Sequence, residues 1–399
     1  MNVKNDFPIF NEYPDLVYLD SGATTHKPNE VIQSMASFYS SNYGTVHRGI
    51  YDLSVKSTNS YNDARSKVTT FINSASDKNI IFTRGTTDSI NLAAFGYLEH
   101  QLKTGDEIII SEVEHHANFV PWQQLAKRHN ITLTFAGIED DGSFNLNKFK
   151  ELISEKTKFI AITHISNVLG TIFPVEEIIA IAKENNIKVL IDGAQAIAHQ
   201  AIDIQQLDPD FYCFSGHKMY GPTGIGICYA SNNVINEMQP IVFGGDMIET
   251  VKKEGTTFTE APLKFEAGTP PIVEAIGMKH AIDYINKLGK DNIKKHEDQL
   301  TDKTLSEMKK IDWIDIIGNA EERSSTISFN IKGIHPHDLG TILDEEKIAI
   351  RVGHHCAQPT MRRFNVPATA RVSFGVYNEE KDIEKLMKAL HNAREVFGY

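Results

Sequence analysis

The sequence predicts an α/β fold, with a large domain built on a mostly parallel sheet and a smaller α+β domain behind it. Between residues 80 and 230, short apolar segments rich in β-branched residues alternate with helix-forming segments, which is the pattern of βα units. After Gly289 this alternation gives way to charged helical sequence and a few short strands. The 399 residues are enough for two domains.

The predicted strands of the large domain lie at residues 17–20, 80–83, 107–110, 131–135, 158–163, 188–191, 211–214 and 225–230. A helix opens at Pro28, and further helices are predicted at 55–73, 89–98, 118–129, 146–153 and 174–184. Residues 255–259 are interpreted as a loop. Because parallel strands need covering on both faces, helices are expected on both sides of the sheet.

A long helix is predicted from Pro270-Pro271 to about residue 288, where Gly289 is a stop signal. It bridges into the small domain, for which we predict helices at 290–310 and 379–397 and strands at 326–331 and 349–352. The expected division is a large domain at 19–287, a small domain at 288–399, and an N-terminal arm at 1–18 that joins the small domain.

Composition narrows the class of protein. The formal net charge is −12 and there is no run of basic residues, so we expect no nucleic-acid partner and no anionic-membrane partner. No apolar run approaches the roughly 18 residues of a membrane-spanning helix, and the polar start shows no secretory signal. Three cysteines make a disulfide framework improbable, and a cytoplasmic location is expected.

Lys218 stands where the apolar strand at 211–214 opens into a glycine-rich loop. A lysine held in a dry pocket loses its proton more readily, because burial disfavours the charged form. The resulting nucleophilic amine is what an imine with pyridoxal phosphate (PLP) requires. The alternative is a solvated loop lysine, which is the commoner situation for a single lysine.

Two further stretches favour the PLP interpretation. Asp192 ends a buried strand, the usual site position in an open α/β sheet, and an aspartate keeps the PLP ring nitrogen protonated. Gly85-Thr86-Thr87 leads into a helix, whose free N–H groups bind anions. Taken singly, the first is also typical of a turn and the second of a capping motif.

These residues belong to a set by which the chain resembles the fold-type I PLP enzymes of the class V aminotransferase group. Within that group it is similar to group II (SUF-type) cysteine desulfurases, which are related to selenocysteine lyase. The resemblance covers nearly the whole chain and implies a sheet of the seven-stranded type. Its motifs are Gly85-Thr86-Thr87, Glu114-His115-His116-Ala117-Asn118, Ser166-Asn167-Val168-Leu169-Gly170, Asp192-Gly193-Ala194-Gln195, Ser215-Gly216-His217-Lys218, Phe265-Glu266-Ala267-Gly268-Thr269, Arg351-Val352-Gly353-His354-His355-Cys356 and Arg371.

The resemblance implies a role for each cofactor residue. Lys218 would bind PLP covalently, Asp192 would pair with the ring nitrogen, and His115 would stack on the ring and help move protons. The other implied contacts are Gln195 at the ring hydroxyl, Asn167 at the ring or substrate, and Thr86, Thr87, Ser215 and His217 at the phosphate. Thr269 would reach the phosphate of a second subunit, which implies a homodimer, although Pro271 stands where the family pattern has asparagine.

Two residues are expected to handle the substrate. Arg371 would bind the substrate carboxylate with its planar fork; the alternative is a surface ion pair. Cys356 follows a strand at 347–352, so its thiol is expected on a loop, where Arg351 or His355 would raise the thiolate fraction. Alternatively, Cys356 is an unreactive small hydrophobe. A zinc cluster with nearby histidines lacks the usual ligand spacing, so no metal is expected.

The function implied is a PLP-dependent cysteine desulfurase, which converts L-cysteine to L-alanine and leaves a persulfide on Cys356. The sulfur would pass to an acceptor protein of a SUF-type system for iron–sulfur cluster assembly, and selenocysteine is a second expected substrate. The alternatives are an aminotransferase or kynureninase-like hydrolase without a persulfide, and a non-catalytic PLP-binding regulator or sulfur-transfer scaffold. Cys356 favours the desulfurase, because those alternatives need no loop thiol.

His337 carries the remaining hypothesis. Some acceptors of this system are zinc proteins that resemble an iron–sulfur scaffold, and a neutral imidazole is a good zinc ligand. We therefore expect His337, rather than His335, to bind the zinc of the acceptor. The alternative is a polar loop in which Asp338 caps a helix.

Overall fold

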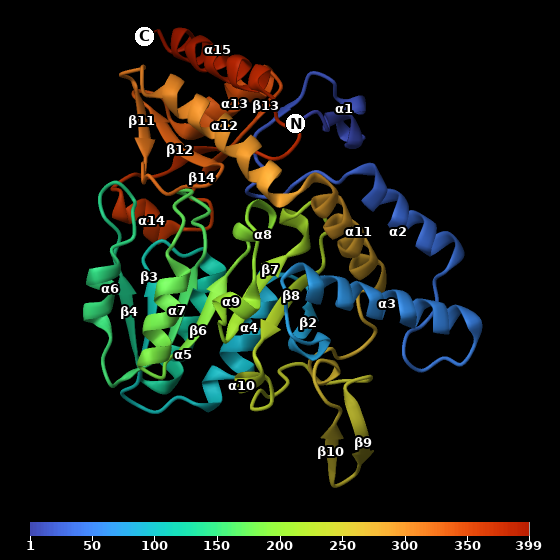
Figure 1. Ribbon diagram of the computed structural model, residues 1–399. Coiled ribbons are helices and arrows are strands. Elements are labelled where there is room, and N and C mark those ends of the chain that lie inside the picture. Colours follow the sequence, from blue (N-terminus) through green and yellow to red (C-terminus); the bar gives the residue numbers. More distant parts are fainter. Residues whose placement is uncertain (399) are drawn as a thin grey trace.

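The computed structural model describes residues 1–398, and their α/β architecture confirms the predicted fold class (Figure 1). A seven-stranded sheet lies at the centre, in the order β2-β8-β7-β6-β5-β3-β4. β8 is antiparallel to both of its neighbours, and the other adjacent pairs are parallel. The strands are β2 (Ile80–Thr83), β3 (Glu107–Ser111), β4 (Thr132–Ala136), β5 (Thr157–Thr163), β6 (Lys188–Asp192), β7 (Phe211–Ser215) and β8 (Gly226–Ala230).

Alternate residues of these strands enter two separate apolar cores, one on each face of the sheet. In β6, for example, Val189 and Ile191 belong to one core and Leu190 to the other. This explains the nearly continuous apolar strands, since a sheet covered on both faces has no polar side. The helices of this part are α2 (Asn29–Ser41), α3 (Asp52–Phe71), α4 (Thr86–Gly96), α5 (Val120–His129), α6 (Leu146–Leu152), α7 (Val175–Glu184), α8 (Ala196–His199), α9 (Ile204–Leu207), α10 (Asn232–Ile235) and α11 (Ile272–Leu288).

A second, antiparallel sheet has the order β11-β12-β15-β14 and a core of its own. Its strands are β11 (Ile314–Ile317), β12 (Thr326–Ile331), β14 (Arg351–Gly353) and β15 (Thr369–Ser373), and its helices are α12 (Lys290–Met308), α13 (Pro336–Glu345), α14 (Gln358–Arg363) and α15 (Glu380–Val396). The N-terminal α1 (Ile9–Glu12) and β1 (Val17–Tyr18) lead to this part, where β1 pairs with β13 (Ile348–Ala349). The division at 287/288 stays a prediction.

One predicted loop is wrong. Residues 255–258 form strand β10 (Gly255–Phe258), which pairs with β9 (Ile248–Lys252) in a hairpin that projects from the body (Figure 1). Both strands are largely exposed, so the sequence carries no alternation of apolar and polar residues to reveal them. The remaining signal is threonine and valine on either side of a two-residue connection.

Two predictions around the small sheet are also corrected. The strand expected at 347–352 is two strands, because β13 pairs with β1 while β14 pairs with β15. The alternative given for His337, a polar loop with a helix cap at Asp338, is wrong as well, since α13 already begins at Pro336, a favoured residue for a first helical position. His335 caps that helix by accepting a hydrogen bond from the His337 N–H at 3.3 Å.

Within residues 1–398, no helix is long and apolar enough to cross a membrane.

Candidate active site

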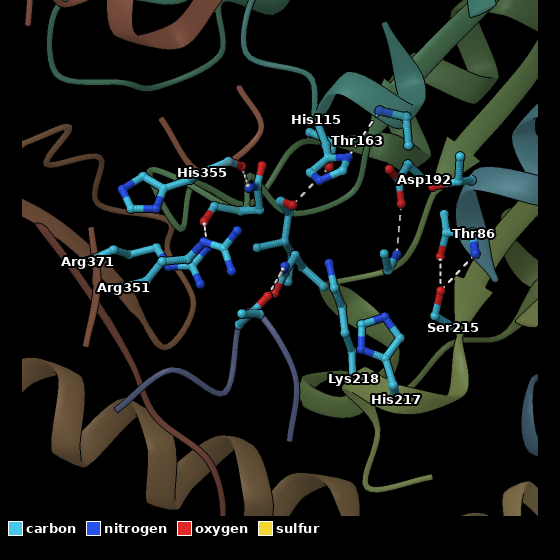
Figure 2. Close-up of a pocket in the computed structure, with 18 residues that line it drawn as sticks. Thr86, His115, Thr163, Asp192, Ser215, His217, Lys218, Arg351, His355 and Arg371 are labelled. Atoms are coloured by element: carbon cyan, nitrogen blue, oxygen red, sulfur yellow. Dashed lines mark hydrogen bonds between the residues drawn. The ribbon is translucent and has the colours of Figure 1, made fainter. Parts of the chain in front are cut away.

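A cavity of about 240 Å³ lies at the carboxyl ends of β5, β6 and β7, beside the small sheet (Figure 2). Parallel strands bring their carboxyl ends to one edge, which explains why residues far apart in sequence meet here. The predicted residues that line this cavity are Thr86, Thr87, His115, Asn167, Asp192, Gln195, Ser215, His217, Lys218 and Arg371. Cys356, Thr269 and His337 do not line it.

Lys218 lies on the short turn η5 (Gly216–Lys218) that follows β7. The neighbouring carbonyl of His217 accepts hydrogen bonds from the Thr25 amide at 3.0 Å, the Thr25 hydroxyl at 3.1 Å and Lys27 Nζ at 3.1 Å. These contacts hold the turn in place. Burial lowers the pKa of Lys218 to about 8, although Asp192 opposes that shift. The cavity therefore contains an amine that loses its proton more readily than a solvated lysine does.

Asp192 ends β6 and is 4% exposed. Its Oδ1 accepts a hydrogen bond from the Ala194 amide at 2.9 Å. Burial raises the pKa of the carboxyl group, while the Ala194 amide and then Lys218 act in the opposite direction. A buried carboxylate facing a cavity needs a cationic partner, and a protonated ring nitrogen would supply one.

The start of α4 forms a polar end of the cavity. The Thr86 amide donates to Ser215 Oγ at 2.7 Å, and the Thr86 hydroxyl lies 2.6 Å from the same oxygen (Figure 2). The helix begins three residues earlier than predicted, so Thr86 and Thr87 stand in its first turn, where amides lack helical partners. A Cβ atom at Gly226, the first residue of β8, would come within 2.4 Å of the Gly85 Cα. The close approach of β8 to the turn before α4 therefore requires glycine at position 226.

The adjacent histidines His115 and His116 face different surroundings. His115 lines the cavity, and its Nδ1 accepts from the Ala117 amide at 3.0 Å, which leaves the proton of the neutral ring on Nε2. Burial, followed by the charge of Lys218, lowers the pKa of His115 to about 3. His116 lies outside this cavity. Among residues 1–398, no group of three or more His, Cys, Asp or Glu side chains is placed to hold a metal ion.

Arg371 lies on β15 and is 1% exposed, so the interpretation as a surface ion pair is wrong. Its Nη1 donates to the Asn167 carbonyl at 2.9 Å, and its Nη2 pairs with Asp20 at 2.8 Å. Nε is buried without a hydrogen-bond partner among the described residues. The Arg371 guanidinium lines the cavity, and a guanidinium in that place is suited to bind a carboxylate.

Arg351 is a cavity residue that the sequence analysis considered only for its effect on the thiol. It lies directly opposite Arg371 in the β14–β15 register, and both side chains line the cavity (Figure 2). Two like charges side by side repel each other, so this arrangement favours an anion between them. Only the strand register reveals the pair.

Cys356 is exposed and lies on the loop between β14 and α14. Two contacts tie this loop to the large domain: the Cys356 carbonyl accepts from the His116 amide at 2.7 Å, and the His355 carbonyl accepts from Asn167 Nδ2 at 2.8 Å. Cys213 and Cys228, by contrast, are buried in the sheet core. Cys356 is therefore the one cysteine of the sequence placed for reaction.

His355 does not supply the positive charge that was expected beside the Cys356 thiol. The His355 ring is buried, and its Nε2 lies 2.8 Å from Thr369 Oγ1. Burial, followed by the charge of Arg371, lowers the pKa of His355 to about 3, so the ring is neutral at physiological pH. A neutral imidazole offers no positive charge to a neighbouring thiolate.

Thr269 and His337 lie elsewhere on the molecule. Thr269 is exposed beside a separate pocket of about 460 Å³, close to Pro271 at the start of α11. His337 is exposed in the first turn of α13, and its ring stacks on that of His335 with centroids 5.5 Å apart. Neither Thr269 nor His337 lines the cavity of its own chain.

The cavity residues fit PLP by their chemistry. One end offers amide and hydroxyl donors for a phosphate, the middle offers an amine for the aldehyde, and a buried carboxylate suits the ring nitrogen. Two arginines remain at the open end for a further anion.

Comparison with known protein families agrees with the assignment of this cavity to PLP. The model of the family described as aminotransferase class-V matches residues 17–386. The chain belongs to this family. Class-V aminotransferases are PLP-dependent, so the predicted cofactor is confirmed.

Several relatives of this chain are named as cysteine desulfurases. A probable cysteine desulfurase of Halalkalibacterium halodurans is 46% identical over 400 residues, which cover 100% of this chain and 98% of the relative. The apo structure of a cysteine desulfurase from Thermococcus onnurineus superposes with a TM-score of 0.94 at 37% identity, covering 98% of this chain and 96% of that one. The cysteine desulfurase CsdA of Escherichia coli gives a TM-score of 0.92 at 36% identity, with 98% of each chain covered.

Proposed function

We propose that this family member is a cysteine desulfurase that converts L-cysteine to L-alanine and places the sulfur on Cys356. The observation that carries the proposal is the exposed Cys356 thiol on a loop bound to residues around the PLP cavity. The names of the relatives support it. An aminotransferase or a kynureninase-like hydrolase requires no such thiol. A PLP-binding regulator or scaffold requires neither a lysine of lowered pKa nor a buried arginine that lines the cavity.

In this mechanism the cavity residues hold the cofactor. Lys218 would bind the cofactor covalently, Asp192 would pair with the ring nitrogen, and His115 would lie against the ring. Gln195 and Asn167 would contact the ring region, and the phosphate would be held by Thr86, Thr87, Ser215 and His217. Bound PLP supplies an electron sink for the charge left on the substrate Cα when its proton is removed. The buried carboxylate of Asp192 supports this, because it stabilises a protonated ring nitrogen.

The residues of the chain carry out the remaining steps. The free amine of Lys218 takes the Cα proton of cysteine, as its pKa of about 8 permits. The Cys356 thiolate then attacks the substrate sulfur: an S–S bond forms, the C–S bond breaks, and its electron pair stays with the carbon. Protonation of that carbon and return of a proton to Cα yield alanine. The balance is L-cysteine plus the Cys356 thiol giving L-alanine plus the Cys356 persulfide.

A substitution of Arg371 tests the proposed contact with the substrate carboxylate. We expect Arg371→Ala to raise KM for cysteine by about 30-fold or more, because a buried charge-assisted contact contributes about 2–4 kcal/mol. Steady-state kinetics measure KM, and the visible absorbance of the cofactor shows that PLP stays bound. Arg362→Ala, at an exposed position on α14, is the matched control. An unchanged KM would remove Arg371 from the substrate contact.

We further propose that the enzyme works in the cytoplasm as a homodimer in a SUF-type system for iron–sulfur cluster assembly, and also cleaves selenocysteine. Thr269 supports the dimer, because it is exposed and does not line the PLP cavity of its own chain. The neighbouring Glu266 anchors that segment through a bidentate ion pair with Arg65 at 2.7 Å. Three free cysteines suit a reducing compartment.

His337 is the residue proposed to contact the acceptor protein. We propose that its imidazole binds the zinc of the acceptor protein, which frees an acceptor thiolate to take the persulfide sulfur. The exposure of His337, on a helix whose Gly340 packs against Val352 of the strand that leads to Cys356, supports this.

The corresponding experiment is His337→Ala, assayed with and without the zinc acceptor. Activity with a small-molecule reductant is expected to be unchanged, and stimulation by the acceptor is expected to be lost. His100→Ala, an exposed histidine of the large domain, is the control. Equal stimulation of wild type and His337→Ala would show that the acceptor docks without this ligand.

A further inference from the structure

His116 contacts the loop that carries Cys356, residues 354–358, which we name the cysteine loop. Its amide donates to the Cys356 carbonyl at 2.7 Å, and its ring Nε2 accepts from the Gln358 amide at 3.1 Å. One residue therefore binds the loop at Cys356 and again two residues later. The first contact uses the backbone of His116, and the second depends on its side chain.

The cysteine loop has a conformation that needs such support. His355 and Cys356 have φ angles of +52° and +55°, in the left-handed region that residues with a side chain rarely adopt. Two consecutive residues of this kind persist only where the surroundings hold them. Before Gln358, the loop is held by the His116 amide on the Cys356 carbonyl, by Asn167 Nδ2 on the His355 carbonyl, and by Thr369 Oγ1 beside His355 Nε2. The first amide of α14 is held by the His116 ring.

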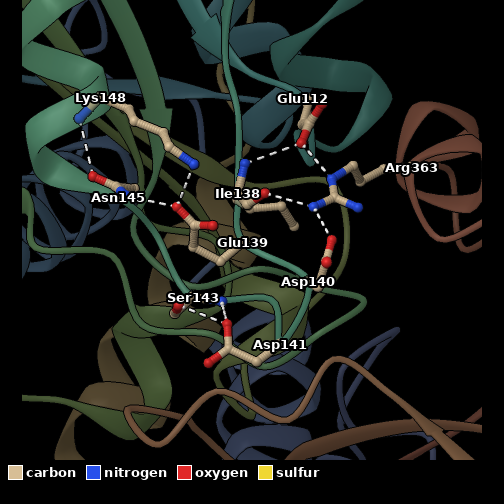
Figure 3. A network of polar contacts seen from close by, with 9 residues as sticks. All are labelled: Glu112, Ile138, Glu139, Asp140, Asp141, Ser143, Asn145, Lys148 and Arg363. Atoms are coloured by element: carbon tan, nitrogen blue, oxygen red, sulfur yellow. Dashed lines mark hydrogen bonds and ion pairs between the residues drawn. The ribbon is translucent and has the colours of Figure 1, made fainter.

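The far end of α14 is anchored to the same part of the large domain. Arg363 Nε pairs with Glu112 at 3.0 Å, and its Nη2 donates to the Ile138 carbonyl and to Asp140, each at 2.8 Å (Figure 3). Glu112 also accepts from the Ile138 amide at 3.0 Å, so it is itself fixed. Because Glu112 and His116 are four residues apart, one short segment holds both ends of α14.

The His116 ring can accept from Gln358 only while its Nε2 carries no proton. Burial, followed by the charge of His354, lowers the pKa of His116, which favours that neutral form. The ring lines two surface pockets with Val120, and one of these also contains Cys356. It therefore stands beside the thiol without entering the PLP cavity.

We propose that His116 is a positioning residue for the sulfur step: its ring nitrogen fixes the cysteine loop so that the Cys356 thiol meets the substrate sulfur. This rests on the proposed desulfurase function. It gives the two adjacent histidines separate tasks, with His115 at the cofactor and His116 at the thiol. No proton transfer or substrate contact is assigned to His116.

The test compares His116→Gln with His116→Met in the PLP-loaded enzyme. The two side chains have similar shape, but glutamine keeps an acceptor near the position of Nε2 and methionine does not. We expect His116→Met to lower kcat for cysteine by about fivefold to tenfold with KM unchanged, the range of one lost hydrogen bond. His116→Gln should restore kcat to within about twofold. Exchange of the alanine Cα hydrogen in D2O, which needs no thiol, should be equal in both.

Hydrogen exchange of the Gln358 amide gives a readout that does not depend on activity. We expect this amide to be protected in the wild type and in His116→Gln, and to exchange about fivefold to tenfold faster in His116→Met. An unprotected Gln358 amide in the wild type would overturn the proposal even if a variant fails to fold. Equal kcat in the two variants, or an effect on KM alone, would also overturn it. A wild type that forms no alanine would instead refute the desulfurase function.

Discussion

Replacing Lys218 by alanine is expected to abolish the visible absorbance of the lysine-linked cofactor and to lower cysteine turnover by at least about a thousandfold. The cavity has no second amine placed to act as anchor and base, because the other cationic residues that line it are Arg351 and Arg371. A guanidinium has no free lone pair to accept a proton, so neither arginine removes the Cα proton. Absorbance spectroscopy and an alanine assay measure the two effects.

Lys188→Ala is the matched control for this experiment. Lys188 stands at the opposite end of β6 from Asp192, where its Nζ pairs with Asp210 at 3.0 Å. Its removal should alter neither absorbance nor turnover. Wild-type release of alanine by Lys218→Ala would refute the assignment of the whole site.

Cys356→Ser is expected to keep the cofactor absorbance and to lose persulfide formation from cysteine by at least about a thousandfold. A hydroxyl is a far weaker nucleophile toward sulfur than a thiolate at neutral pH. Cys356 lies outside the PLP cavity, which is why the cofactor should be unaffected. Persulfide is measured by mass spectrometry of the protein, and alanine by a coupled assay. Selenocysteine should still be cleaved, since its C–Se bond is weaker.

Cys228→Ala is the control for the thiol. Cys228 is buried in β8, so its removal leaves a small cavity and no change in chemistry. This variant should turn over cysteine like the wild type. Full desulfurase activity in Cys356→Ser would mean that another thiol or a reagent in solution carries the sulfur.

The pattern of apolar strands and intervening helices was enough to predict the α/β fold. Strands buried on both faces must be apolar throughout, and this property is visible in the sequence. The same pattern located Lys218 and Asp192, because residues that follow parallel strands gather at one edge of a sheet. The Thr86 region was predicted from a glycine turn that leads into a helix, although α4 begins three residues earlier than expected. The family resemblance supplied the residue roles, which remain proposals.

The exposed hairpin was missed because its stability does not depend on burying one face. β9 mixes apolar, threonine and charged residues on both of its faces, and β10 contains glycine, two threonines and phenylalanine, so no periodicity distinguishes them from a loop. Only backbone pairing reveals them. The start of α13 was missed for a related reason: the cap is the side chain of His335, where aspartate was expected.

What the sequence by itself determined was the order of the strands along the chain and the chemistry that each strand end carries. The tertiary structure decided which of those groups meet. Arg351 faces Arg371 because of the β14–β15 register, and the neutral state of His355 follows from its burial beside Arg371. The His116 ring meets the Gln358 amide across 242 positions of sequence. Such contacts depend on long-range packing, which no local pattern of residues encodes.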